Sequence, residues 1–330
     1  MYNTIKRYIS CFSVTGNEKY LADIIAEDMA PYVDSVMTDP MGNLICLKKG
    51  KDSTRRMMFA AHMDEIGFVV TYIEKNGYIR VSNVGGINAV ASSSHEVEFI
   101  NGTKGVLIFE SETSEYNVKK LYVDIGAKSR KDAERRVHIG DYLALTQNVT
   151  RLGNRRIAGK AMDDRLGCAV IAEAAKFIGT PAYDTYFVFT TQEEVGLRGA
   201  KAAANAILPL YGIACDVTPT YDTIGSKGGE VTLGGGAAIK VKDSSVICSK
   251  KVVDRLAALA EENKIKYQYE VLLAGGTDTA SMQIAGAGCF AGCISVPCRY
   301  VHQPVETVDL KDCEAAVKLF AAIAEEGFDK

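Results

Sequence analysis

The chain of 330 residues lacks the features that mark membrane, secreted or nucleic-acid-binding proteins. No apolar run approaches the roughly 20 residues that a membrane-spanning helix needs. The formal net charge is −3, and lysine and arginine form no stripe interleaved with aromatic residues, so we expect no nucleic-acid partner. The first residues form an amphipathic segment and do not resemble a signal peptide. These absences together favour a cytoplasmic protein with no membrane partner.

Cysteine pairs are also missing. The nine cysteines are odd in number and scattered along the chain. Cys289, Cys293 and Cys298 are the closest together, but their spacing differs from that of CxxC zinc pairs. Most of the cysteines lie in apolar runs, which is typical of buried free thiols in a reducing compartment. At this length, with 47% hydrophobic residues, the chain can form one large core and a smaller second domain.

Histidine is scarce, with four residues in the chain, and one of them opens the most informative pattern. His62 and Asp64 follow the apolar run 57–60, which predicts a buried strand. Residues two apart on a strand point to the same side. The Asp64 carboxylate can therefore hold one ring nitrogen of His62 and leave the other for a metal. Taken alone, this motif is explained as well by a purely structural histidine.

Paired carboxylates recur at later positions of the same kind. Asp163 and Asp164 precede a small apolar segment with helical propensity, and an N-cap role explains one of the two well. Glu193 and Glu194 follow the β-branched and aromatic run 186–191, with Gln192 between. Adjacent carboxylates raise each other's pKa until a cation binds one of them. Because these pairs stand at the ends of buried elements, metal binding explains them better than a position on the exposed surface does.

Two single residues complete the pattern. Asp216 follows the apolar run 211–214, and His302 lies near the C-terminus. Two histidines and several carboxylates at strand ends form a nitrogen and oxygen ligand set that suits zinc or cobalt, with manganese as an alternative. The sequence therefore predicts a divalent metal site.

The pattern of apolar and polar residues changes between residues 68 and 157. Short alternating runs are separated by Asn-Gly turns at 76–77 and 101–102, which are strong hairpin signals. We expect a small β-barrel there, with helical segments at 119–121 and 127–134. The flanking parts, 1–67 and 158–330, alternate between helix and strand and are expected to form one α/β domain.

Nearly the whole chain resembles the di-metal aminopeptidases, a family that includes tetrahedral (TET) aminopeptidases, glutamyl aminopeptidases and proteins often labelled endoglucanase or cellulase M. The motifs that carry the resemblance occur in one order, at residues 9–18, 39–44, 61–68, 162–165, 191–196, 275–278 and 299–306. The resemblance implies a mixed-sheet α/β/α, zinc-peptidase-like catalytic domain. It also implies that the inserted barrel mediates dimerisation.

The resemblance assigns a role to each candidate residue. It implies two metal ions per chain, bridged by the carboxylate of Asp163, and a peptide after Asp163 that is often cis. The remaining roles that it implies are ligands of one metal for His62 and Asp216, ligands of the other for Glu194 and His302, the general base for Glu193 and the partner of His62 for Asp64.

The expected function is a metallo-aminopeptidase that releases N-terminal residues from peptides by attack of metal-activated water. Relatives form dimers that assemble into a hollow tetrahedral dodecamer, so we expect a homo-oligomer with small peptide substrates. An N-acyl-amino-acid deacylase, or a related di-metal amidohydrolase, would use the same chemistry. A glycosidase is disfavoured, because it needs two carboxylates around a glycosidic bond without metal ligands. Residues 87–95 and 233–239 depart from the family pattern, which leaves oligomer size and side-chain specificity open.

Overall fold

An eleven-stranded mixed sheet forms the centre of the larger part of the computed structural model, which describes residues 1–146 and 148–329. Its strands are β1 (Ser35–Thr38), β2 (Leu44–Lys48), β3 (Asp52–His62), β10 (Thr150–Leu152), β11 (Arg156–Gly159), β12 (Tyr183–Thr190), β13 (Tyr211–Pro219), β14 (Ala237–Lys242), β15 (Tyr267–Val271), β16 (Phe290–Arg299) and β17 (Glu306–Asp309). The order is β1-β2-β12-β3-β13-β16-β17-β11-β10, and β14 joins β15 to β16. The four central strands β12, β3, β13 and β16 are mutually parallel.

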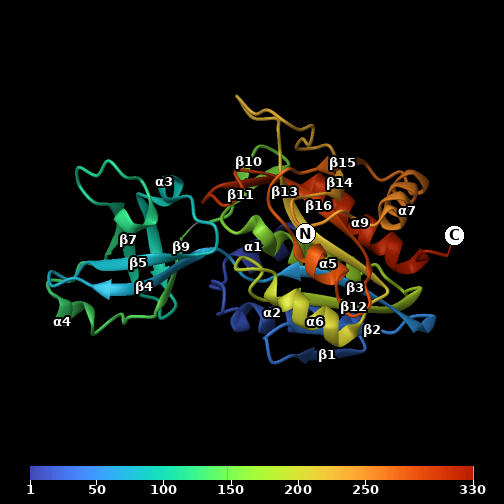
Figure 1. Ribbon diagram of the computed structural model, residues 1–330, viewed down its shortest axis with the longest axis horizontal. Helices are drawn as coiled ribbons and strands as arrows, with labels where there is room; N and C mark the ends of the chain where they lie inside the picture. Colours follow the sequence, from blue (N-terminus) through green and yellow to red (C-terminus); the bar gives the residue numbers. More distant parts are fainter. Residues whose placement is uncertain (147, 330) are drawn as a thin grey trace.

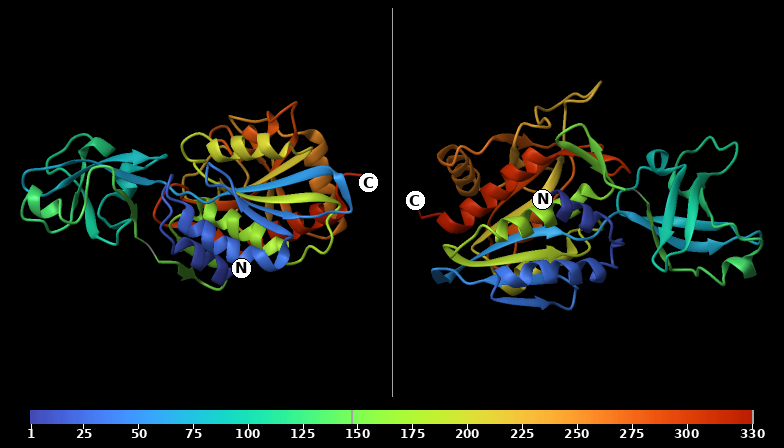
Figure 2. Two further views of the ribbon diagram at one scale, coloured as in Figure 1. Left: turned by 90° about the horizontal axis from the view of Figure 1, so that it is seen from below. Right: turned by 180° about the vertical axis from the view of Figure 1, so that it is seen from behind.

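Helices cover both faces of this sheet, as Figures 1 and 2 show. One face carries α1 (Tyr2–Ile9), α2 (Lys19–Met29), α5 (Met162–Ala175), α7 (Lys250–Glu262) and α9 (Leu310–Glu326), with the short 3₁₀ turn η1 (Ala30–Tyr32) after α2. The other face carries α6 (Arg198–Ile207) and α8 (Asp278–Gln283). Strand β3 serves both layers, because Met57 and Phe59 point to the first face while Met58 and Ala60 point to the second.

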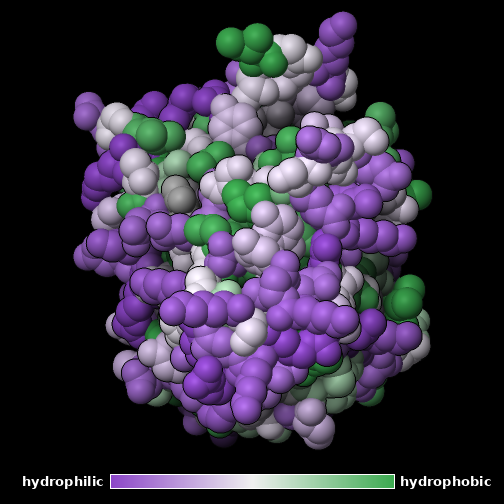
Figure 3. Space-filling model, turned by 90° about the vertical axis from the view of Figure 1, so that its left-hand side faces the viewer, coloured by the Kyte–Doolittle hydropathy of each residue, from purple (hydrophilic) through white to green (hydrophobic). Residues whose placement is uncertain are grey.

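The insert is a closed barrel at one end of the molecule (Figure 1). Its strands, in the order β4-β5-β8-β7-β6-β9, are β4 (Gly67–Ile73), β5 (Ile79–Val84), β6 (His95–Phe99), β7 (Lys104–Phe109), β8 (Leu121–Asp124) and β9 (Tyr142–Leu145). It also holds the short helices α3 (Ala89–Ser92) and α4 (Arg130–Ala133) and the 3₁₀ turn η2 (Val118–Lys120). Its hydrophobic core is separate from that of the sheet, and its outer end is mostly hydrophilic (Figure 3).

The prediction of a mixed-sheet α/β/α body with an inserted β-barrel is confirmed. The helix expected at 119–121 is wrong at its end, because Leu121 begins β8 and its side chain enters the barrel core. The helix expected at 127–134 is limited to α4. Residues 150–157, which the sequence boundary placed in the insert, contribute to β10 and β11 of the large sheet, where β11 pairs with β17.

All nine cysteines are free thiols, and all except the half-buried Cys289 are buried. Among the helices of the described residues, none combines the length and the apolar character that a bilayer span requires.

Candidate metal centre

The candidate residues meet where the central parallel strands end. His62 is the last residue of β3, and Glu193 and Glu194 follow β12, whose Thr190 pairs with His62. Parallel strands bring their carboxyl ends to one edge, which is the usual ligand site of open α/β sheets. Asp216 was expected just beyond a strand but lies inside β13, which continues to Pro219.

Asp163 lies between the two histidines. Its Oδ1 atom is 3.0 Å from His62 Nε2, and its Oδ2 atom is 3.2 Å from His302 Nε2. The peptide bond that joins Asp163 to Asp164 is cis. Asp164 Oδ1 accepts a hydrogen bond from the Gly167 N–H at 2.9 Å, so this second carboxylate caps the regular part of α5. The division of roles leaves Asp163 free to face both imidazoles.

The other carboxylates close around this centre. Glu194 Oε1 lies 3.6 Å from His302 Nε2, and Glu193 Oε2 lies 3.9 Å from His62 Nε2. Among the residues that the structure describes, two groups have ligand atoms within 4.8 Å of one another and could hold a metal ion: His62 with Asp163 and Glu194, and His62 with Asp164 and Asp216. The structure therefore brings all five predicted ligands together, and it adds Asp164 to their immediate neighbours.

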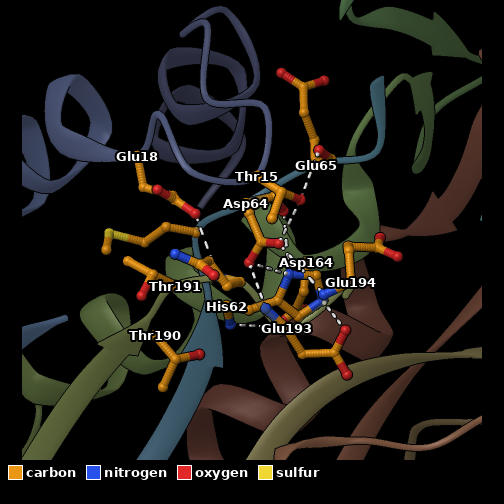
Figure 4. Close-up of polar contacts among 12 residues, drawn as sticks. Thr15, Glu18, His62, Asp64, Glu65, Asp164, Thr190, Thr191, Glu193 and Glu194 are labelled. Carbon is orange, nitrogen blue, oxygen red and sulfur yellow. Dashed lines mark hydrogen bonds and ion pairs between the residues drawn. The ribbon is translucent and has the colours of Figure 1, made fainter. Parts of the chain in front are cut away.

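Asp64 organises the turn that carries the two glutamates. Its Oδ1 accepts the Glu193 N–H at 3.0 Å, and its Oδ2 accepts the Glu194 N–H at 3.3 Å and the Thr15 hydroxyl at 2.7 Å. Figure 4 shows Asp64 between Thr15 and His62. The predicted carboxylate contact to His62 Nδ1 is longer, at 3.5 Å, than the contact of that nitrogen to the Asp64 backbone oxygen at 3.1 Å. Asp64 therefore orients the imidazole with both its carbonyl and its carboxylate.

The pKa values in the site are shifted because several buried carboxylic acids lie close to one another and to two imidazoles. Burial alone lowers the pKa of His302, but the adjoining Asp163 carboxylate outweighs it and raises that pKa to about 10. Burial, reinforced by the charge on Asp163, raises the pKa of Glu194 to about 8. Burial also raises the pKa of Glu193 and Asp216 well above the usual range. Protons therefore occupy this cluster when no other cation does.

The residues fit a divalent cation. Glu194 Oε1 is buried and has no hydrogen-bond partner among the described residues, although a carboxylate oxygen in such a place normally has one. The donor set consists of imidazole nitrogens and carboxylate oxygens, which suit zinc and its neighbours in the first transition row. Unpaired buried oxygens and mutually repelling carboxylates are what a bound cation would relieve.

Several residues in and beside the sequence motifs support the site through contacts that the sequence did not predict. Thr190 Oγ1 donates to Asp278 Oδ2 at 2.5 Å, and Glu18 accepts hydrogen bonds from the Gly16 and Gln192 N–H groups. The carboxylate of Glu306 accepts hydrogen bonds from the backbone of two candidate ligands. Their polar character inside the motifs was the available signal, but several partners lie far away in the sequence, since Asp278 is 88 positions from Thr190 and Gln192 is 174 positions from Glu18.

The sequence profile described as M42 glutamyl aminopeptidase matches residues 42–319. The chain belongs to this family. It is therefore a metallo-aminopeptidase, a hydrolase of peptide bonds. This M42 enzyme is 34% identical to the lysyl aminopeptidase of Pyrococcus furiosus, in an alignment that covers 98% of this chain and 97% of the relative.

Solved structures agree with this assignment. An aminopeptidase from the archaeon Desulfurococcus kamchatkensis superposes with a TM-score of 0.96 at 36% identity, covering 99% of this chain and 94% of the other. The TET1 peptidase of Pyrococcus horikoshii, which can assemble into a tetrahedron or a large octahedral shell, superposes with a TM-score of 0.90 at 31% identity, covering 98% and 99%.

Proposed function

We propose that this M42 enzyme removes single residues from the free N-terminus of peptides, with two divalent cations in each chain. The observation that carries the proposal is the position of Asp163, whose two carboxylate oxygens each face a different imidazole. That arrangement supports a bridging carboxylate. His62 and Asp216 would complete one cation site, and Glu194 and His302 the other.

The donor set favours zinc or cobalt, with manganese as the alternative, because imidazole and carboxylate ligands occur together. Two cations at such a site supply Lewis-acid polarisation of the scissile carbonyl and of the attacking water. The protein supplies the rest. Its own contributions are orientation of the ligands, exclusion of bulk water by burial, and transfer of a proton.

Glu193 is the group best placed to move that proton. Its Oε2 atom lies 3.9 Å from His62 Nε2, which places the carboxylate beside the ligand cluster. The two histidines approach Asp163 more closely, at 3.0 and 3.2 Å. Its backbone N–H is fixed by Asp64 at 3.0 Å. We assign to the Glu193 carboxylate the removal of a proton from the attacking water and its delivery to the leaving amine nitrogen.

The free amine of the substrate is the group that the centre is suited to recognise. With two divalent cations bound, their charges would offset those of the Asp163, Glu193, Glu194 and Asp216 carboxylates, and one cation would be free to bind the lone pair of the substrate's α-amine. A deacylase would instead need a cationic clamp for the free carboxylate of its substrate. A glycosidase would need carboxylates free of metal ligands, whereas those here surround two imidazoles.

Assembly is part of the proposal. The resemblance to TET peptidases and the separate core of the barrel support an insert that joins chains into dimers and dimers into a larger shell. A closed shell of this kind would admit short or unfolded peptides. Light scattering at micromolar concentration tests this assembly, and a monomeric mass would contradict it.

A matched pair of peptides tests the function. One peptide has a free α-amine and the other is acetylated there, and cleavage of both is followed at neutral pH with added cobalt or zinc. Acetylation removes both the charge and the available lone pair of the amine, so cleavage should be confined to the free peptide. Equal cleavage of both, or preference for the acetylated one, would favour the deacylase.

A further inference from the structure

Glu306 is a buried carboxylate beside the metal centre that the proposed mechanism does not use. It is the first residue of β17 and is 2% exposed. Its position in the sheet is fixed, because it pairs with Gly159 of β11 just before the segment that carries Asp163. A buried acid on a rigid strand is well suited to hold a neighbouring loop in place.

The carboxylate of Glu306 accepts hydrogen bonds from the backbone of two candidate ligands. Its Oε2 atom accepts from the Asp163 N–H at 3.1 Å, and its Oε1 atom accepts from the His302 N–H at 2.7 Å. Asp163 and Glu306 are 143 positions apart in the sequence. One side chain thus links the bridging aspartate to the loop of the second histidine.

The backbone at both linked segments, near Asp163 and at His302, adopts conformations that need such support. His302 has a φ of 61°, and Ala161, two residues before Asp163, has a φ of 51°. Both lie in the left-handed region, which residues other than glycine seldom occupy. Conformations of this kind persist where the surroundings fix them, and they cluster at functional sites. The hydrogen bond from the His302 N–H to Glu306 therefore helps to hold His302 in its left-handed conformation.

We propose that Glu306 is a positioning residue that sets the distance between the Asp163 carboxylate and the His302 imidazole. This inference rests on the proposed ligand roles of those two residues. Both belong to the second cation site, whereas the first also draws on His62 and Asp216. Loss of Glu306 should therefore weaken one of the two sites more than the other.

The test compares Glu306→Gln with a matched control, Asp312→Asn. Asp312 is also buried and also accepts two backbone hydrogen bonds, from the N–H groups of Gly234 and Gly236. An amide has one oxygen, so each variant keeps at most one of the two bonds at full strength. The two variants thus share a similar structural loss at different places.

Zinc is titrated into each metal-free protein by calorimetry. In Glu306→Gln we expect one of two binding events to weaken by about 10- to 100-fold, as is typical when a residue that orients a ligand is lost. Activity should return as zinc is raised, with KM nearly unchanged. Asp312→Asn should bind two ions as the parent does. Two unchanged binding events in Glu306→Gln would overturn the proposal, whether or not the enzyme proves to require a free N-terminus.

Two further measurements guard against a variant that fails to fold. Glu306→Asp keeps both oxygens on a shorter side chain and should weaken the same binding event less. In the unaltered protein, hydrogen exchange at the Asp163 and His302 amides should be slow. Exchange at either amide as fast as in an exposed loop would contradict the two hydrogen bonds on which the proposal depends.

Discussion

A Cβ atom at Gly86 would lie 2.8 Å from His302 Nδ1. Gly86 belongs to the turn after β5 of the barrel, whereas His302 lies beyond β16 of the large sheet. The neighbouring Gly85 is similarly close to Glu194, since a Cβ atom there would lie 3.3 Å from Glu194 Oε2. The insert thus contributes no predicted ligand, but its backbone forms a wall of the metal centre.

Gly86→Ala should therefore disturb the second cation site. The added methyl group would push the His302 imidazole from its place, because a real Cβ atom seldom comes within 3.0 Å of a neighbour. We expect zinc affinity at one site to fall by about tenfold or more, measured by calorimetry. Gly179→Ala is the control, since its nearest neighbour would be Glu325 Oε1 at 3.4 Å. Equal affinities in the two variants would argue against contact between turn and imidazole.

Glu193→Gln should abolish most activity and leave metal binding intact. The substitution removes the proposed base and keeps its size, and proton transfer by a positioned group contributes about 10²- to 10⁴-fold to rate. Elemental analysis should still find two ions per chain. Turnover close to that of the parent would exclude Glu193 as the base, and loss of metal would make it a ligand instead.

Asp163→Asn should impair both cation sites at once. An amide offers one oxygen and carries no charge, so it can no longer face His62 and His302 with equivalent donors. By contrast, His302→Ala should impair one site and spare the other. Calorimetric titration with zinc distinguishes the two variants. Retention of one full-strength site in Asp163→Asn would show that this carboxylate does not bridge.

Zinc affinity should rise with pH across the neutral range. In the metal-free chain the pKa of His302 is raised to about 10 and that of Glu194 to about 8, so an entering cation must displace protons. Affinity should increase by about tenfold per pH unit for each proton displaced. Titrations at pH 6, 7 and 8 test this, and an affinity independent of pH would show that the histidine and the glutamate carry no proton to be displaced.

The same shifts predict the stability of the metal-free chain. A raised pKa means that the folded state binds the proton more tightly than the unfolded state. For His302 this contribution is complete below about pH 6.5 and is lost as the pH rises through about 10. For Glu194 it is lost between about pH 4.5 and 8. The unfolding temperature of the chelator-treated protein should therefore fall from pH 6 to pH 9, while that of the zinc-loaded protein falls less.

The sequence by itself determined the elements and the chemistry. Apolar runs that end in acids or histidine predicted where β3 and β12 stop, because a parallel strand must bury its length and release polar groups at its end, whereas β13 continues past Asp216 to Pro219. Hairpin turns predicted the barrel, although β8 was missed because the lysines before it are typical of a helix. Residue types at these ends predicted a nitrogen and oxygen site that includes His62, Asp163 and His302.

Tertiary structure alone decided how those ends are held in place. The Asp163 N–H donates to the Glu306 carboxylate, and the Glu193 and Glu194 N–H groups donate to the Asp64 carboxylate. These partners are more than 100 positions apart, so no local pattern relates them. The approach of Gly86 to His302 depends on how the barrel is set against the sheet. Side-chain periodicity follows from one chain segment and can be read locally, whereas partners far apart in sequence are chosen by the packing of whole elements.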